Sequence, residues 1–248
     1  MKGEIKEMAE KFLDYDGLAY VLEKLKGVYV AKQDGYGLSE NNFSDEYKQI
    51  VDDLNYKKIT VNSMSATNSS NEIGSTVTAS TVTWALNKDP KTQKIKFGSE
   101  AEEVLGTELR SKAYTEKSVQ SNTTITLTVT DERDAVVTKS VTISFQPKVY
   151  WGVSNKTSLA TADILALANS ALASSRGRTF SVNAGAGEYI YYAIPSSFGT
   201  PTFNVGGFDG GFVKVGTVSH QNASGYTQNY DVWKSVNAAL GQTSVTVK

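Results

Sequence analysis

The chain has 248 residues and a net charge of -1, with 40% hydrophobic and 21% charged residues. These values are typical of a soluble globular protein, and the length fits two domains of about 100 residues plus an extension. No run approaches the roughly 20 apolar residues that cross a bilayer, so we expect no membrane insertion. The N-terminus lacks the apolar core and small-residue cleavage site of a secretory signal, which predicts synthesis and folding in a cytosol.

The absence of cysteine and the presence of a single histidine, His220, limit the chemistry. Disulfides and cysteine-ligated metals are excluded, and a catalytic triad would have to be built around His220 alone. His220 lies in a polar run, so we expect a solvated loop side chain without a catalytic role. Asp14, Asp16 and Gly17 suit a calcium loop in part, but the distal glutamate is missing, which favours a helix cap. We therefore predict no metal and no cofactor.

The charge is unevenly distributed along the chain. Residues 1–57 contain 8 lysines against 12 acidic residues, whereas residues 148–248 contain 7 basic residues against 4 acidic ones. Neither end is basic enough for the strongly positive face that nucleic-acid binding requires, so no nucleic-acid partner is predicted. The acidic amino terminus is compatible with a docking segment.

Apolar residues at helical spacing predict two short helices between residues 5 and 25. The stretch from Asp14 to Gly17 interrupts them, with Asp14 or Asp16 capping the second helix and Gly27 ending it. A third helix is predicted after Ser44, since serine is a good N-cap and the next two residues are acidic, as the helix dipole favours.

Each of these helices has one apolar stripe, and short helices are marginal in water on their own. We therefore predict that residues 1–57 are a helical docking or oligomerisation segment ordered by neighbouring chains. The alternative for the third helix is a capped linker that rests on its own domain. The residues predicted to dock are Ile5, Met8, Phe12, Leu18, Leu22, Leu25, Phe43, Ile50 and Leu54.

Between residues 58 and 147 the hydrophobic period changes from helical to alternating. Val82, Trp84 and Leu86 share one face of a predicted strand, as expected of a half-buried strand. About seven strands fit, which predicts an immunoglobulin-like (Ig-like) sandwich around Trp84 without a disulfide. The predicted strands are residues 59–64, 73–77, 81–86, 95–97, 110–117, 125–129 and 141–145.

Residues 148–248 are predicted to form a second β-rich, sandwich-like domain with one helix. Thr161 is a plausible N-cap for a helix from Ala162 to about Leu172, whose apolar residues have helical spacing. The predicted strands are residues 149–154, 179–182, 188–194, 202–205, 212–219, 226–236 and 243–247. The fold class is thus mainly β, with an N-terminal helical segment and two β domains.

The second β domain holds most of the aromatic residues. Tyr189 and Tyr191 share one strand face and Tyr192 points to the other, so we expect at least one of them to be exposed. Exposed aromatic rings can bind sugars or partner proteins, although core packing claims most aromatics in a small sandwich. The candidate ligand surface consists of Tyr189, Tyr192, Tyr226 and Trp233.

Two further segments invite a catalytic interpretation that we do not adopt. A glycosidase needs two carboxylates about 5 to 10 Å apart across a cleft, whereas the acidic residues 131–134 lie between two predicted strands and indicate a solvated turn. Residues 206–211 are rich in glycine but lack the lysine spacing and following helix of a phosphate-binding loop. No catalytic residues are predicted.

Several motifs point to one family. The segment that starts at Gly37 reads G-L-S-E-N-N-F-S-D-E-Y-K and resembles the G-L-S-x-N-D-F-[ST]-x-E-x-K-x-K-L segment of fibres and other tail proteins of tailed bacteriophages. Residues 12–18 read F-L-D-Y-D-G-L and resemble the F-L-D-x-x-G-L opening of many phage tail proteins. Residues 58–147, and Y-W-G-V-S and G-E-Y-I-Y-Y-A-I-P in the last domain, are similar to Ig-like and C-terminal modules of such proteins.

This resemblance implies a non-enzymatic structural protein of a virion, made in the host cytoplasm and located in a tail, fibre, baseplate or related appendage. It implies contacts with other virion proteins and self-association, often threefold. The alternative is an adhesion module that binds a receptor or carbohydrate, a host surface glycan or protein, through the aromatic residues of the last domain. A hydrolase lacks an adequate set of histidine, cysteine or paired carboxylates.

Overall fold

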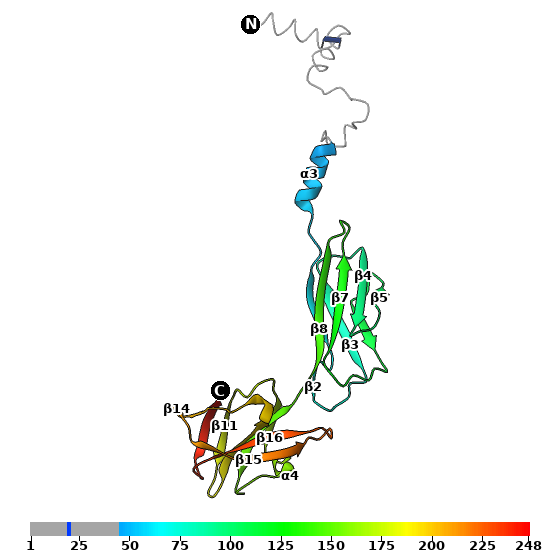
Figure 1. The fold of residues 1–248 in the computed structure, drawn as a ribbon. Helices are drawn as coiled ribbons and strands as arrows, with labels where there is room; N and C mark the ends of the chain where they lie inside the picture. The colour runs from blue at the N-terminus through cyan, green and yellow to red at the C-terminus, as the bar shows by residue number, and fades with distance from the viewer. Residues whose placement is uncertain (1–18, 21–44) are drawn as a thin grey trace, which may run out of the picture. The chain divides into compact units, whose positions relative to one another are not determined.

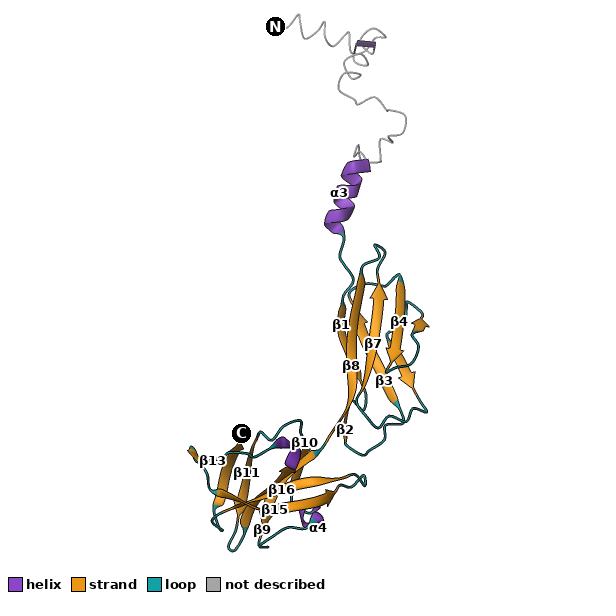
Figure 2. Cartoon of the chain, viewed as in Figure 1, coloured by secondary structure: helices purple, strands orange, loops and turns teal. Residues whose placement is uncertain are grey.

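The structure is a computed structural model that describes residues 19–20 and 45–248 (Figure 1). It is mainly β, as predicted, with one well-defined helix followed by two β sandwiches (Figure 2). The chain divides into two units between Lys57 and Lys58, and both sandwiches belong to the second unit. Within the described residues, no helix has both the length and the apolar character that a membrane span requires.

The helix predicted after Ser44 is confirmed as α3, which spans Asp45–Asn55. Its first residues are acidic, which the positive end of the helix dipole favours. Gln49 Nε2 donates a 3.0 Å hydrogen bond to Asp53 Oδ1 one turn later, so polar residues on α3 stabilise each other locally. Ala19 and Tyr20 are also helical.

The first sandwich consists of a three-stranded and a five-stranded sheet. The three-stranded sheet has the order β1 (Val61–Ala66), β3 (Ser80–Leu86), β6 (Ser111–Tyr114). The five-stranded sheet has the order β2 (Ser70–Glu72), β8 (Val136–Gln146), β7 (Thr123–Thr130), β4 (Thr92–Phe97), β5 (Glu103–Leu105). All neighbouring strands are antiparallel except β2 and β8, which are parallel.

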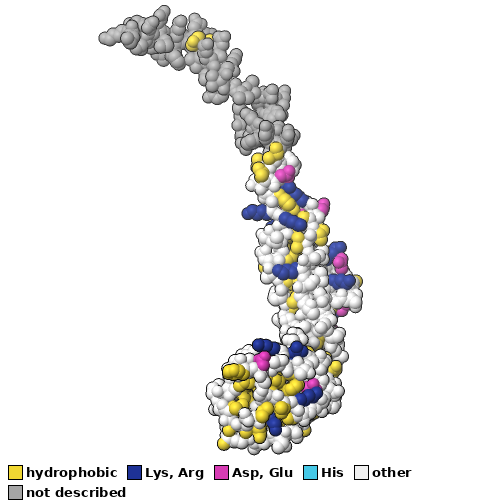
Figure 3. All heavy atoms as spheres, turned by 60° about the vertical axis from the view of Figure 1, so that its left-hand side comes forward, with side chains coloured by type: hydrophobic (Ala, Val, Ile, Leu, Met, Phe, Trp, Pro, Cys, Tyr) yellow, Lys and Arg dark blue, Asp and Glu magenta, His cyan; other side chains and the backbone are white. Residues whose placement is uncertain are grey.

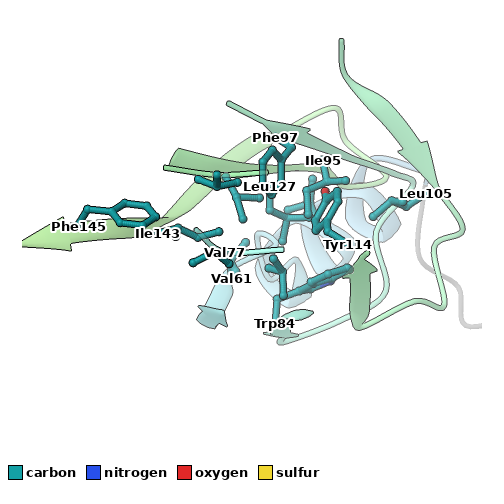
Figure 4. Packing of buried hydrophobic residues seen from close by; sticks show 14 of the residues in the cluster. Val61, Val77, Trp84, Ile95, Phe97, Leu105, Tyr114, Leu127, Ile143 and Phe145 are labelled. Atoms are coloured by element: carbon teal, nitrogen blue, oxygen red, sulfur yellow. The ribbon is translucent and has the colours of Figure 1, made fainter. Parts of the chain in front are cut away.

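Trp84 lies in the core of this sandwich, as predicted, with 4% of its surface exposed (Figure 4). Its Nε1 donates a 3.0 Å hydrogen bond to Oε1 of Gln93, a fully buried glutamine on the opposite sheet. The amide nitrogen of Gln93 in turn donates to the carbonyl oxygens of Gly106 and Leu109. Because each polar group has a partner, the core contains an amide and an indole without the cost of unpaired donors.

Two strands of the first sandwich differ from prediction. The apolar residues at 73–77 do not form a strand, because Gly74 has a φ of +89° that breaks the extended backbone; β2 ends just before it. The short strand β5 was not predicted from the sequence. It lies at the sheet edge and exposes 72% of Val104, so its burial pattern does not alternate.

The predicted turn at residues 131–134 is confirmed between β7 and β8, but Asp131 is buried rather than solvated. Its Oδ1 accepts hydrogen bonds from the backbone N–H groups of Arg133 and Ala135, both at 3.0 Å. Its Oδ2 accepts from Ile59 N at 3.1 Å and lies 3.5 Å from Lys88 Nζ. Asp131 therefore fixes the turn and also the chain that enters the first sandwich.

We predict that Asp131→Ala lowers the free energy of unfolding of the first sandwich by about 3 kcal/mol, because one buried and two part-buried backbone donors lose a charged acceptor. Urea unfolding followed by Trp84 fluorescence measures this change. Glu132→Ala is the matched control, since the neighbouring Glu132 is exposed and pairs with Lys88 at the surface. Equal midpoints for the two variants would contradict the structural role of Asp131.

The second sandwich also has two sheets. The five-stranded sheet has the order β10 (Asn169–Leu172), β9 (Lys148–Ser154), β12 (Tyr189–Pro195), β16 (Thr227–Ser235), β15 (Phe212–Gln221). The four-stranded sheet has the order β11 (Arg178–Ala184), β17 (Gly241–Val247), β13 (Phe203–Val205), β14 (Phe208–Asp209). A short 3₁₀ helix, η1 (Ser196–Phe198), follows β12.

The helix predicted over residues 162–172 is shorter than expected. The structure has α4 over Thr161–Leu165, capped at Ala160 rather than Thr161, and residues 169–172 form β10 instead. Pairing with β9 provides the backbone of β10 with partners. Gly152 on β9 permits the close approach, since a Cβ there would lie 3.0 Å from Ala168 N. Tertiary pairing therefore overrides the local helical pattern.

β12 is buried on both faces. Ile190, Tyr192 and Ile194 pack between the two sheets, whereas Tyr191 and Ala193 pack on the opposite side with Ile164 of α4. A strand that is covered on both faces has a nearly continuous apolar run instead of an alternating one. The expectation that one of its tyrosines is exposed is wrong, because Tyr191 and Tyr192 have 0% exposure and Tyr189 is partly buried.

Candidate functional site

The predicted docking stripe is exposed where the structure describes it. On α3, the side chains of Ile50, Val51 and Leu54 are 46%, 44% and 81% exposed. They recur at three- and four-residue spacing, so they share one side of the helix. The other predicted docking residues lie outside the described part of the chain; they are Ile5, Met8, Phe12, Leu18, Leu22, Leu25 and Phe43.

Tyr192 does not form part of a ligand surface. Its ring stacks on Phe180 at 5.5 Å between centroids and meets Phe203 edge-on at 5.9 Å. Its hydroxyl donates a 2.8 Å hydrogen bond to the carbonyl oxygen of Arg176. Burial raises the pKa of the Tyr192 hydroxyl to about 12, so the group stays neutral and serves as a core anchor.

The other three candidate aromatics occupy different environments. Tyr189 is partly buried, with the Lys234 ammonium 4.3 Å from its ring centroid. Trp233 is also partly buried, packs against Phe203, and has a buried Nε1 without a hydrogen-bond partner among the described residues. Tyr226 is 40% exposed in the turn between β15 and β16. The four residues therefore do not form one surface.

Exposed apolar side chains that were not predicted lie on the β13–β14 hairpin, on β15 and just after β16. Phe208 is 81% exposed, and Val213 and Val236 are 45% and 55% exposed. Val236 N donates to Gly211 O at 2.9 Å, which brings the end of this hairpin beside β16. Within the glycine-rich residues 206–211, Gly206 and Gly207 form the turn and both have positive φ, as a type I′ hairpin requires, whereas Phe208 and Asp209 form β14. Figure 3 shows hydrophobic side chains gathered on one face of this sandwich.

An open depression of about 500 Å³ lies elsewhere on the second sandwich. Arg176 is fixed within it, because Nε donates to Lys248 O and Nη1 to Phe198 O, both at 3.0 Å. The lining contains serine hydroxyls and the ring of Phe198 but no aspartate or glutamate side chain. It consists of Ser174, Ser175, Arg176, Gly177, Ser197, Phe198 and Lys248. Hydroxyls, a fixed guanidinium and an aromatic ring are groups that can bind a polar, hydroxylated ligand.

A cluster of polar side chains in the second sandwich is centred on Asp231. Asp231 Oδ1 accepts hydrogen bonds from Ser196 Oγ at 2.7 Å and Thr217 Oγ1 at 2.8 Å, and it lies 2.8 Å from Lys214 Nζ. Burial opposes ionisation of Asp231, but the bonds from Lys214, Ser196 and Thr217 outweigh it and lower its pKa. Ser196 therefore donates its hydroxyl hydrogen to an ionised carboxylate that Thr217 and Lys214 also contact.

His220 is not the solvated loop residue that the sequence predicted. It lies on β15 with 0% exposure, in contact with Tyr150 and Tyr230. The ring packs against Tyr230 of the adjacent strand β16 and Tyr150 of β9, while its sequence neighbours Ser219 and Gln221 are exposed. Among residues 19–20 and 45–248, no group of three or more potential metal ligands is found.

Comparisons with known proteins do not assign a family. No protein-family model and no curated protein matches the chain. Among solved structures, it is similar to chitinase ChiA74 from Bacillus thuringiensis, at 12% identity over 75% of this chain and 26% of that one, with a TM-score of 0.26. It is also similar to an alpha-L-rhamnosidase from Dictyoglumus thermophilum, at 9% identity over 78% and 25%, with a TM-score of 0.24. The chain thus spans about a quarter of each structure, and likenesses this weak carry no argument about function.

We predict that Tyr192→Ala destabilises the second sandwich by about 3–5 kcal/mol, because it removes a large buried ring. Tyr192→Phe keeps the ring and loses only the bond to Arg176 O, so its cost is about 1 kcal/mol. Thermal or urea unfolding of both variants measures the difference. A Tyr192→Ala protein as stable as the parent chain would show that the ring is not a core anchor.

Proposed function

We propose that the chain is a non-enzymatic structural protein of a tailed-bacteriophage virion, which docks through residues 1–57 and projects two β sandwiches from the particle. The observation that carries the proposal is the exposed stripe of Ile50, Val51 and Leu54 on α3. It lies in the segment whose sequence resembles phage tail proteins.

The stripe requires a partner on energetic grounds. α3 has 11 residues, whereas isolated helices shorter than about 12–15 residues are marginal in water. Full burial of one aliphatic side chain stabilises by about 1.5–3 kcal/mol, so three such side chains can order the helix. The partners in this proposal are other virion proteins and further copies of the chain, with a trimer as one arrangement.

The first sandwich suits a spacer because its outer face is lined with hydroxyl groups rather than apolar side chains. Thr124 and Thr142 form a 3.1 Å hydrogen bond across β7 and β8, and Thr126 and Ser140 form another at 2.9 Å. Such cross-strand pairs stabilise a sheet while its surface stays solvated. This face supports a projecting domain rather than one buried in a shell.

We expect the double variant Ile50→Asp/Leu54→Asp to abolish self-association and incorporation into particles, because burying two carboxylates in an apolar contact is costly. Light scattering should give the monomer mass of 26.8 kDa for the variant and a multiple of it for the parent chain. Antibody labelling of purified particles should show parent chain but not variant.

Asn55→Asp is the matched control, since it adds a charge at an exposed position of the same helix. It should assemble as the parent chain does. Normal particle occupancy of the double variant would refute docking through this stripe and favour a linker helix.

A second candidate function is adhesion to a host-surface carbohydrate or protein receptor. The depression around Arg176 and Phe198 favours it, because it offers hydroxyls, a guanidinium and an aromatic ring at one place. The role is compatible with the first, since a projecting protein can also bind.

For this adhesion role we predict that Phe198→Ala reduces glycan binding at least tenfold while leaving the fold intact, since the ring is only partly buried. Glycan arrays with host polysaccharide provide the measurement. Phe208→Ala is the control for a general loss of exposed rings, because Phe208 lies on the β13–β14 hairpin. Loss of binding in the control alone would move the site to the hairpin, and absence of binding in the parent chain would leave a purely architectural role.

A further inference from the structure

The turn between β15 and β16 contacts the segment that follows β2 in the first sandwich. Asn222 Nδ2 donates a 2.7 Å hydrogen bond to Ile73 O. The same amide is held in place, because Asn222 Oδ1 accepts from Ser224 N at 3.0 Å and Tyr226 N at 2.9 Å. Close by, Lys148 Nζ forms a 2.8 Å ion pair with Glu72 Oε2. We call these contacts the junction.

Gly74 shows how closely the two segments meet. A Cβ at this position would lie 2.4 Å from the Cβ of Tyr226, a distance that real atoms do not tolerate. Gly74 also has a φ of +89°, a conformation that side-chain-bearing residues rarely adopt. The junction is thus a specific, tightly packed contact that only glycine permits.

His220 lies two residues before Asn222 and is completely buried. Its ring centroid is 5.2 Å from that of Tyr150 and 4.6 Å from that of Tyr230, both in edge-on arrangements. Neither ring nitrogen has a hydrogen-bond partner among the described residues. Buried polar atoms without partners are rare and costly, and a charged imidazole in this position would cost more.

Of His220 and the side chains packed around it, His220 is the group that we expect to change charge between pH 5 and 8. On β9 and β16, Tyr150 and Tyr230 stay neutral, since burial raises the pKa of Tyr230 to about 12 and that of Tyr150 further. On β2, the Glu72 carboxylate accepts from Tyr150 Oη at 3.4 Å and pairs with Lys148.

Two other charge pairs lie on elements near β15 and are already matched. Asp163 of α4 pairs with Lys156, and Asp231 of β16 pairs with Lys214, a residue of β15 itself. Each of these acids is balanced by its lysine, so neither offsets a positive charge on the His220 ring. Within residues 45–248, the charged group that acts on the pKa of His220 is Glu72, which opposes the larger effect of burial.

We propose that His220 is a proton switch for the junction: the neutral ring packs between the tyrosines and keeps the β15–β16 turn on Ile73, and protonation of the ring releases this turn. The inference does not depend on the virion role, since it rests on contacts within residues 58–248.

The direction of the pH effect follows from the linkage between proton binding by His220 and closure of the junction. Burial lowers the pKa of His220 below the 6.5 of a solvated histidine, with the Glu72 carboxylate opposing this effect. The closed junction therefore binds fewer protons than an open one, and its stability is complete above pH 6.5 and is lost as the pH falls below it. The ratio of open to closed molecules rises by up to about tenfold for each pH unit between the two pKa values.

The composition of the chain allows this proposal to be tested without signals from competing residues. It has a single histidine, so one imidazole resonance in an NMR titration reports His220 directly. It has no cysteine, so Thr138→Cys and Ser244→Cys place two spin labels on exposed strand positions, one in each sandwich, without competing thiols. We expect a pKa below 6.5 and a distance distribution that is narrow at pH 7.5 and broad at pH 5.

Two variants complete the test. His220→Phe keeps the aromatic contacts without a titratable group, so its distribution should stay narrow at both pH values. Gly74→Ala disrupts the junction at neutral pH, so it should raise the pKa of His220 towards 6.5 and broaden the distribution at pH 7.5. Circular dichroism at both pH values controls for unfolding.

Three results would overturn the proposal. They are a His220 pKa at or above 6.5, a distance distribution in the labelled parent chain that is unchanged at pH 5, and a His220 pKa that Gly74→Ala leaves unchanged.

Discussion

The burial of β12 on both faces is the constraint on which most of the second sandwich depends. One face of this strand contributes Tyr192 to the core between the sheets, and the other contributes Tyr191 to the cluster beneath α4. The Tyr191 hydroxyl donates to Lys156 O at 2.5 Å, which ties the segment before α4 to the strand. Because α4 and its flanking residues cover the second face, the tyrosines of β9, β12 and β16 are structural residues and not a binding platform. His220 of β15 is fully buried against two of these tyrosines, Tyr150 and Tyr230.

The sequence predicts the positions of the helices and strands better than it predicts which of their faces are buried. Alternation in β3 and β7 correctly places Trp84 and Leu127 in a core, because one face of each strand is solvated and the pattern has a period of two. The pattern fails at β12, since a strand covered on both faces loses alternation, and at residues 169–172, where pairing with β9 replaces helix. Neither cover is encoded locally, so neither could be deduced from spacing alone.

The candidate site was less predictable than the fold for the same physical reason. Tyr192 was an attractive surface residue because tyrosine is common at binding sites, whereas its burial depends on Phe180 and Phe203, which are distant in sequence. Phe208 could have been found, since it lies between two pairs of glycines in a tight hairpin that leaves no neighbour to cover it. His220 could not, because its polar sequence neighbours point to solvent while its own side chain faces β9 and β16.

Asp131 and His220 are both buried polar groups, but they differ in whether their polar atoms have hydrogen-bond partners. This difference distinguishes a group that stabilises one conformation from a group that can respond to pH. Asp131 is buried and accepts hydrogen bonds from three backbone N–H groups, so its carboxylate oxygens have partners. His220 is equally buried, but the described residues offer its ring nitrogens no acceptor or donor. A buried charge whose atoms all have hydrogen-bond partners stabilises one conformation. A buried base without partners is more stable in its neutral form than in its charged form. His220 lies two residues from Asn222, whose side chain contacts Ile73 of the first sandwich, so a change in the charge of the ring occurs beside this contact.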